Sequence, residues 1–460
     1  MGRSHLDLPL QSTLGFFVQG VPVVFVQAEI ALGSDRKMQA YLDFYRRCEE
    51  GGVHDPPLTL DLCQAYESFV TLLHEVRHFH DALLCRPLFE MFISHTQVSL
   101  CVVQLASKLP SGTGHIPVDW RDPRIAGTPE IKLLKETIFN DDELYFTRFS
   151  SLWDMCALDA FEIDLFYLLE ASAMLAEFLY LYVVHGIRST EDYYSYVVLQ
   201  KSDAKYTLLI DLFKRLHGNL IDALQALYVA LAYSLFSSDA PAQTFCDLVQ
   251  DTKSDPKAIF TLCNPNTLQH AFRDEAALAD RIRRTVPIGR QGVVRVNSEN
   301  NSNSVSELLN LNQTMYACRE RLITTYVQRF GYRADLYFEH LYELPIPPVL
   351  FFPELASPDD QLVKGVPEDE FRRHKAPLFV IAARTRENLD KLVIAGLTTI
   401  PGTKPPFSLE LADMQLCNEY FYKCLFEGKT SVYAPIVDHM YKNVLLTMPA
   451  FASHGTRTRE

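Results

Sequence analysis

The chain has 460 residues, of which 48% are hydrophobic and 22% are charged. These proportions are those of an average globular protein, so they exclude disordered, collagen-like and fibrous classes. The 43 Lys and Arg residues against 57 Asp and Glu residues give a net charge of −14. Because nucleic-acid-binding proteins normally carry a basic surface, this balance argues against nucleic acid as a partner.

The N-terminal region predicts a small β element. Its polar opening is followed by GFFVQGVPVVFVQAEI, in which Gly, Pro and Gln interrupt the apolar run and no signal-peptide cleavage pattern follows. The Val and Phe content of residues 16–30 favours a β-hairpin. The ten cysteines include no CxxC pair, which is typical of reduced intracellular thiols. We therefore expect a cytoplasmic protein.

The rest of the chain is predicted to be mainly helical. Apolar residues recur with helical spacing in four long stretches, namely Asp61–Cys85, Met155–Val184, Tyr206–Phe236 and Val305–Phe330. One further strand is expected at Leu378–Ala382. The predicted fold is mainly α (α+β with a small N-terminal β element), a multi-helix bundle around the first of these helices.

A polar segment, NSENNSNS at residues 297–304, predicts a linker or surface loop. It divides the chain into a helical unit at residues 1–296, which carries the N-terminal hairpin and the candidate site described below, and a mainly helical region at residues 305–460. The second region is expected to pack on the first or to form a separate domain. Within it, the Pro-rich stretch 344–353 is expected to be a connector.

Residues 74–78 read HEVRH and form the one motif that indicates a chemistry. On a helix, His74 and His78 lie one turn apart on the same face, so both rings can bind one metal ion. Glu75 points about 100° away, where a carboxylate can act as general base on a metal-activated water. The pattern is therefore typical of metal-assisted hydrolysis.

The surroundings of HEVRH predict that it lies on a helix. Thr59 and Asp61 provide start signals and Pro87 provides a stop signal. An apolar stripe runs along one side of this helix, and the polar residues gather on the opposite side: Glu67, Thr71, His74, His78 and Asp81.

HEVRH resembles the motif of the HExxH zinc metallopeptidases. The metzincin form is excluded, because the third His it requires would fall at Leu84 and its Gly at Asp81. The motif is similar instead to that of the gluzincins, in which a Glu on a later helix is the third ligand. The resemblance implies a zinc (Zn²⁺) cofactor, a peptide or protein substrate, and a Tyr or His that stabilises the oxyanion. Candidates for the last role are Tyr193, Tyr194, Tyr196 and His185, and their spacing does not choose among them.

Glu170 and Glu177 are the candidates for the third ligand. They lie seven residues apart on one face of a helix, 165–186, that is apolar almost all the way round. A buried carboxylate is costly unless it is paired or metal-bound, so both require a partner. We expect Glu170 to bind the metal, Glu177 to orient a ligand from behind it, and Asp81 to accept the second ring N–H of a ligating histidine. The Asp found in many gluzincins four residues after the Glu ligand is here Met174.

Three alternatives remain open at this stage. Glu170 and Glu177 could pair with Arg or Lys side chains. Glu75 and His78 also spell ExxH, the ligand pair of ferritin-like di-iron oxidases and oxygenases, although the helix at 155–187 carries no second ExxH. The chain could also be a non-catalytic helical scaffold with a degenerate motif. A membrane span at 165–186 is not expected, because two Glu residues lie in its middle.

Overall fold

A computed structural model describes most of the first 264 residues and shorter parts of the remainder. The described residues are 15–17, 24–27, 36–91, 93, 152, 154–200, 206–264, 272, 275, 278, 315–325, 333–339, 341, 344–345, 349–352, 393–394 and 398–399. The expected linker at 297–304 and the expected strand at 378–382 lie outside them.

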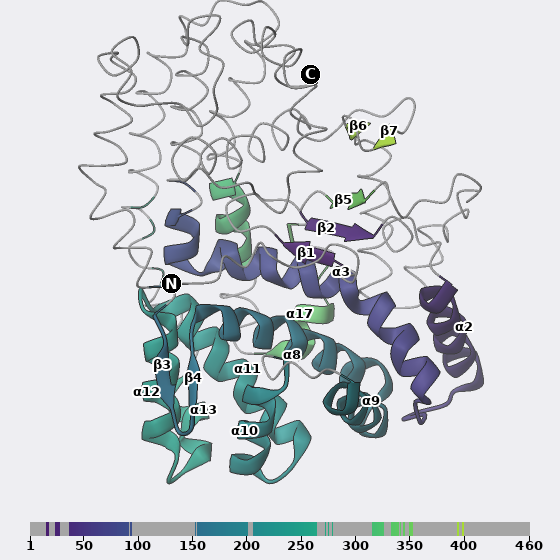
Figure 1. Ribbon diagram of the computed structural model, residues 1–460, viewed down its shortest axis with the longest axis horizontal. Coiled ribbons are helices and arrows are strands. Elements are labelled where there is room, and N and C mark those ends of the chain that lie inside the picture. The colour runs from purple at the N-terminus through teal and green to yellow at the C-terminus, as the bar shows by residue number, and fades with distance from the viewer. Residues whose placement is uncertain are drawn as a thin grey trace, which may run out of the picture.

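The fold is mainly helical with small β elements, which confirms the predicted class. Helix α3 (Leu60–Leu84) is its central element, and Figure 1 shows it crossing the middle of the molecule. Helix α2 (Arg36–Gly51) packs on α3, and so does α8 (Leu165–His185). A small sheet covers another side of α3 (Figure 1). The HEVRH helix is therefore enclosed by other elements rather than lying on the surface.

Local signals account for the bounds of α3. The Thr59 side chain accepts a hydrogen bond from the Leu62 N–H at 3.3 Å, which caps the N-terminus, and Asp61 adds a favourable negative charge in the first turn. The helix ends at Leu84, and a new helical turn begins at Arg86, with Pro87 near its start. The predicted helix and its stop signal are confirmed.

The expected N-terminal strand pair is confirmed, and it has a third member. Strands β1 (Gly15–Phe17) and β2 (Val24–Gln27) pair antiparallel, with Phe16 opposite Phe25. Strand β5 (Val349–Phe352) then pairs parallel to β2. The prediction that 344–353 is only a connector was therefore wrong. The apolar VLFF segment gains ladder hydrogen bonds from a strand more than 300 residues earlier, which local sequence cannot reveal.

Helix α8 begins later than predicted. The first part of the Met155–Val184 stretch is a hairpin of β3 (Cys156–Leu158) and β4 (Phe161–Ile163), turned at Asp159 with φ +54°. Asp164 then caps α8 by accepting a hydrogen bond from the Tyr167 N–H at 3.1 Å. This cap explains why the helix cannot extend back through the hairpin.

Gly186 ends α8 and allows an abrupt turn into α9 (Ile187–Gln200). Its φ of +110° suits glycine alone, and an added Cβ would lie 2.8 Å from Oδ1 of Asp55. That carboxylate accepts a hydrogen bond from the Arg188 N–H at 2.6 Å, in the first turn of α9. The turn brings α9 into contact with α8.

The predicted helix at Tyr206–Phe236 is in fact two helices. Helix α10 (Leu208–His217) ends at Gly218 in the left-handed conformation, φ +83°, and α11 (Leu220–Ser237) begins after Asn219, which caps it. The Gly-Asn pair breaks the helix although the apolar periodicity continues. Helices α12 (Pro241–Thr252) and α13 (Ile259–Leu262) follow, with the short 3₁₀ turn η5 (Pro256–Ala258) between them, and α8 lies between α3 and the α10–α12 group (Figure 1).

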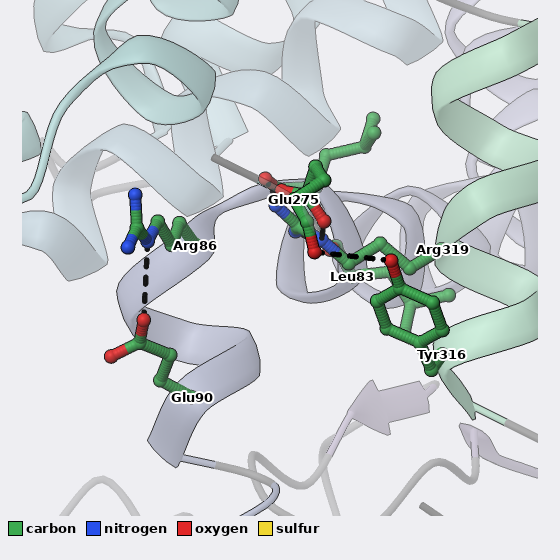
Figure 2. Close-up of polar contacts among 7 residues, drawn as sticks. Leu83, Arg86, Glu90, Glu275, Tyr316 and Arg319 are labelled. Atoms are coloured by element: carbon green, nitrogen blue, oxygen red, sulfur yellow. Dashed lines mark hydrogen bonds and ion pairs between the residues drawn. The ribbon is translucent and has the colours of Figure 1, made fainter. Parts of the chain in front are cut away.

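Later segments pack against the far end of α3. Residues 315–325 are helical, and Arg319 from this segment is completely buried. Its guanidinium donates to Glu275 at 3.0 and 2.5 Å and to the carbonyl of Leu84 at 2.9 Å. It also donates to the carbonyl of Leu83, and Figure 2 shows Arg319 beside Glu275 and Leu83. These carbonyls are the unsatisfied C-terminal acceptors of α3, so Arg319 caps the helix that carries HEVRH. The remaining described elements are α17 (Ala334–Glu339), β6 (Val393–Ile394) and β7 (Thr398–Thr399).

Two described helices, α8 and α11, are long and apolar enough to cross a membrane by composition alone. In each, 72% of the most apolar window is buried inside the protein. Both carry buried alanines, among them Ala171, Ala173 and Ala230. An apolar composition of this kind is also that of helices buried in the core of a bundle.

Candidate metal centre

Helices α3 and α8 bring His74, His78 and Glu170 together. One ligand atom from each of the three lies within 4.8 Å of the others, and no further cluster of this kind is found among the described residues. The two imidazole rings lie 4.8 Å apart between centroids and are inclined at 79°. Glu170 lies in a stretch of α8 that is rich in small buried residues, namely Ala171, Ala173 and Ala176. The three side chains predicted to be metal ligands therefore converge.

The distances within this group suit an ion between the three residues. The Nε2 atom of His74 lies 3.8 Å from Oε2 of Glu170, and the Nε2 atom of His78 lies 3.8 Å from Oε1 of the same carboxylate. These distances are too long for hydrogen bonds. Two ligand atoms on one tetrahedral zinc, with bonds of about 2.0–2.1 Å, stand about 3.3 Å apart, so the three side chains are spaced slightly more widely than a metal-bound set. Each side chain retains 12% exposure, so the group is accessible from solvent.

Glu177 lies behind His74, on the side away from Glu170. Its Oε1 is 2.7 Å from Nδ1 of His74, and only 4% of its side chain is exposed. A carboxylate that accepts the Nδ1–H of a histidine fixes the ring and leaves Nε2 as the nitrogen available to a metal ion, which is the arrangement seen behind many metal ligands. The structure thus places Glu177 in the position predicted for an orienting residue.

The charges around His74 are strongly negative. Burial alone lowers the pKa of this imidazole, but the nearby carboxylates of Glu170, Glu177 and Glu75 outweigh burial and raise its pKa to about 10. Three acidic groups around one ring form a site that attracts a cation. A proton on His74 and a metal ion on the same ring would compete for this negative field.

Glu75, the predicted general base, is buried, with 5% exposure. Its negative charge contributes to the raised pKa of His74. Because it is adjacent to His74 in the helix, it points to a different side from the two histidines. The carboxylate is not among the three side chains whose ligand atoms converge.

Asp81 does not contact a histidine ring and instead forms an ion pair with Arg77 at 3.0 Å. This corrects the expectation that it accepts a ring N–H from a ligand. Burial raises the pKa of Asp81, whereas the Arg77 charge opposes that shift. Arg77 also donates from Nε to Oγ of Ser172 at 3.0 Å. Ser172 lies two residues beyond Glu170, so this contact helps to set the register of α8 against α3.

The candidate oxyanion residues have other partners. The hydroxyl of Tyr193 donates to Glu177, that of Tyr194 to Asp211 and that of Tyr196 to Glu67. His185 bonds the Tyr41 hydroxyl at 3.0 Å within a cluster of aromatic rings. These four residues therefore take part in packing and hydrogen bonding. Of the four, Tyr193 is the one whose hydroxyl donates to Glu177, the residue behind His74.

Sequence reasoning missed two residues that hold α3 in place. Arg77 sits at a variable position of HEVRH, and the signal that could have identified it is Asp81 four residues later, since charges with this spacing pair along a helix. The sequence gives no such signal for Arg319. Its partner Glu275 lies more than 40 residues away along the chain, and its partner Leu84 lies more than 230 residues away. His80 has a structural role, because its ring nitrogens bond the Tyr337 hydroxyl at 3.0 Å and the Pro345 carbonyl at 2.8 Å.

Comparison with models of protein families, with curated proteins and with solved structures finds no match for this chain.

Proposed function

We propose that the chain is a zinc-dependent hydrolase, a metallopeptidase that cleaves peptide bonds with an activated water. The observation that carries this proposal is the convergence of His74, His78 and Glu170 from two helices, with ligand atoms within 4.8 Å of one another. Two histidines and one glutamate are a donor set of catalytic zinc sites, which keep a fourth position open for water or substrate. The partial exposure of the three side chains supports such an opening.

The roles of the protein groups follow from their places. Zn²⁺ held by the three side chains would supply Lewis acidity, which polarises a carbonyl and lowers the pKa of water towards about 7. Glu75 accepts the proton of the attacking water and later delivers it to the leaving amine. Glu177 holds His74 in the tautomer and orientation that present Nε2 to the metal.

Two substitutions separate these roles. Glu75→Gln removes the base but no ligand, so the variant should retain zinc and lose turnover by about 10²–10⁴-fold. His78→Ala removes a ligand, so the variant should lose the metal. Glu50→Gln, at an exposed carboxylate on α2, is the matched control and should change neither property. Zinc per chain is measured by elemental analysis, and turnover with a mixed library of fluorogenic peptides.

The same measurements discriminate the alternatives. One zinc per chain supports the hydrolase, two irons would support a di-iron oxidase or oxygenase, and no metal would support a scaffold. Loss of zinc from Glu75→Gln would contradict the role assigned to that residue. Turnover that persists in both Glu75→Gln and His78→Ala would contradict the proposed reaction.

A further inference from the structure

We propose that Tyr193 is a positioning residue of the metal centre, which acts through Glu177 to hold His74 in its metal-binding orientation. The inference rests on the proposed metal site and adds a residue to it. The Tyr193 hydroxyl donates to Oε2 of Glu177 at 2.6 Å, and Oε1 of the same carboxylate lies 2.7 Å from Nδ1 of His74. A chain of three side chains therefore leads from α9 through α8 to α3.

The position of Tyr193 is rigidly defined. The side chain is completely buried, and its ring packs edge-to-face on Tyr66 at 4.8 Å and against Phe178 at 5.3 Å between centroids. Tyr66 in turn donates its hydroxyl to the main-chain carbonyl of Glu177 at 2.5 Å. Two tyrosines in mutual contact thus hold the backbone and the side chain of the same glutamate.

Tyr193 remains a hydrogen-bond donor throughout the working pH range. Burial, followed by the negative charges of Glu177 and Glu67, raises the pKa of this phenol well above its ordinary value of 10. A neutral hydroxyl that donates to a carboxylate stabilises the ionised form of that carboxylate. Glu177 is then kept as an acceptor for the Nδ1–H of His74, and Nε2 of His74 is left to bind the metal.

Removal of the hydroxyl should weaken metal binding without unfolding the protein. In Tyr193→Phe, the ring contacts remain, but Oε2 of Glu177 loses a donor in a buried place. The carboxylate is then less well fixed, and His74 becomes a less well oriented ligand. Loss of a group behind a metal ligand typically weakens metal affinity by about 10–100-fold.

The test compares zinc affinity in Tyr193→Phe and Tyr196→Phe, made in the full chain. Tyr196 lies on the same helix, and its ring stacks on that of Tyr193 at 5.9 Å between centroids, a contact that phenylalanine keeps. Its hydroxyl donates to Glu67 at 2.8 Å and not to Glu177, so Tyr196→Phe is a matched control for the loss of a hydroxyl. Dissociation constants are measured by competition with a chromophoric zinc chelator. We expect about 10–100-fold weaker binding for Tyr193→Phe, and less than about threefold change for Tyr196→Phe.

Two further readouts distinguish positioning from a general loss of stability. The visible absorption bands of the Co²⁺-loaded protein report on ligand orientation and should shift in Tyr193→Phe alone. In a Glu177→Gln background, the added substitution Tyr193→Phe should have no further effect on zinc affinity, because it acts through Glu177. Melting temperatures of the metal-free variants show whether the fold itself has changed.

The outcomes separate the two claims. If the unaltered chain binds no zinc, both the metal site and this inference are overturned. If the unaltered chain binds zinc, and Tyr193→Phe binds it equally well with an unshifted Co²⁺ spectrum, only the role of Tyr193 is overturned. An equal loss of affinity in Tyr193→Phe and Tyr196→Phe would likewise overturn it.

Discussion

Arg319→Met tests how firmly the HEVRH helix is held by a segment more than 230 residues later. The Arg319 guanidinium is completely buried and donates to both oxygens of Glu275 and to the carbonyls of Leu83 and Leu84. Its positive charge also lies over the ring of Phe89, 5.0 Å from the centroid. Methionine keeps part of the volume of the side chain but none of these polar contacts.

The expected cost follows from these contacts. Removal of one partner of a buried ion pair destabilises a protein by about 3–5 kcal/mol. The Glu275 side chain keeps 16% exposure and can regain some hydration, which places the cost near the lower limit, at about 3 kcal/mol. This is a large fraction of the roughly 5–15 kcal/mol that stabilises a typical domain.

The assay is urea unfolding followed by far-ultraviolet circular dichroism. The matched control is Arg46→Met, because Arg46 pairs with the exposed Asp43 on α2 at 3.3 Å. Surface pairs contribute about 0.2–1 kcal/mol, so this control should change the free energy of unfolding by less than 1 kcal/mol. A loss below about 1 kcal/mol for Arg319→Met, or equal losses in both variants, would refute the assigned role of Arg319.

Three further predictions concern other parts of the fold. Gly186→Ala should lower the free energy of unfolding by about 2 kcal/mol or more in urea titrations, since its φ of +110° excludes other residues and the new Cβ would collide with the Asp55 carboxylate; a neutral substitution would contradict the described turn. Burial lowers the pKa of His185 to about 4, so the unfolded chain binds a proton at this imidazole more readily than the folded chain does. The free energy of unfolding should therefore fall by up to about 3 kcal/mol as pH decreases from about 6.5 to 4. His185→Gln, which still accepts the hydroxyl proton of Tyr41, should flatten that part of the stability profile, and an unchanged slope would show that other groups cause it. Arg77→Met should destabilise the fold by about 3 kcal/mol at neutral pH, because the buried Asp81 carboxylate loses the cation that pairs with it. A second substitution, Asp81→Asn, should recover part of this loss. A double variant less stable than Arg77→Met would contradict the pairing.

The parts of the site that sequence could predict are those set by helical periodicity. The spacing of His74 and His78 fixes their common face, and two carboxylates on an otherwise apolar helix require a partner. Both arguments depend on residues within one element. They led to Glu170 and Glu177, which the structure places in front of and behind the His74 ring.

The parts that sequence could not predict depend on contacts between distant segments. The parallel pairing of β2 with β5 and the capping of α3 by Arg319 join residues more than 230 positions apart. The assignment of Asp81 failed for a related reason. Asp81 was assigned to the metal site because it lies on the same polar face of α3 as His74 and His78. Arg77, four residues earlier in the same helix, pairs with Asp81 and neutralises its charge. Local breaks at Asp164 and Gly218 were also concealed by apolar periodicity that continues across them.

The most direct test of the account is an anomalous difference map, recorded above and below the zinc absorption edge, from crystals grown with one equivalent of zinc. The account predicts a single strong peak within about 2.0–2.2 Å of Nε2 of His74, Nε2 of His78 and one carboxylate oxygen of Glu170. A map with no peak between α3 and α8, or with its strongest peak on other residues, would contradict the metal centre and the hydrolase proposed from it.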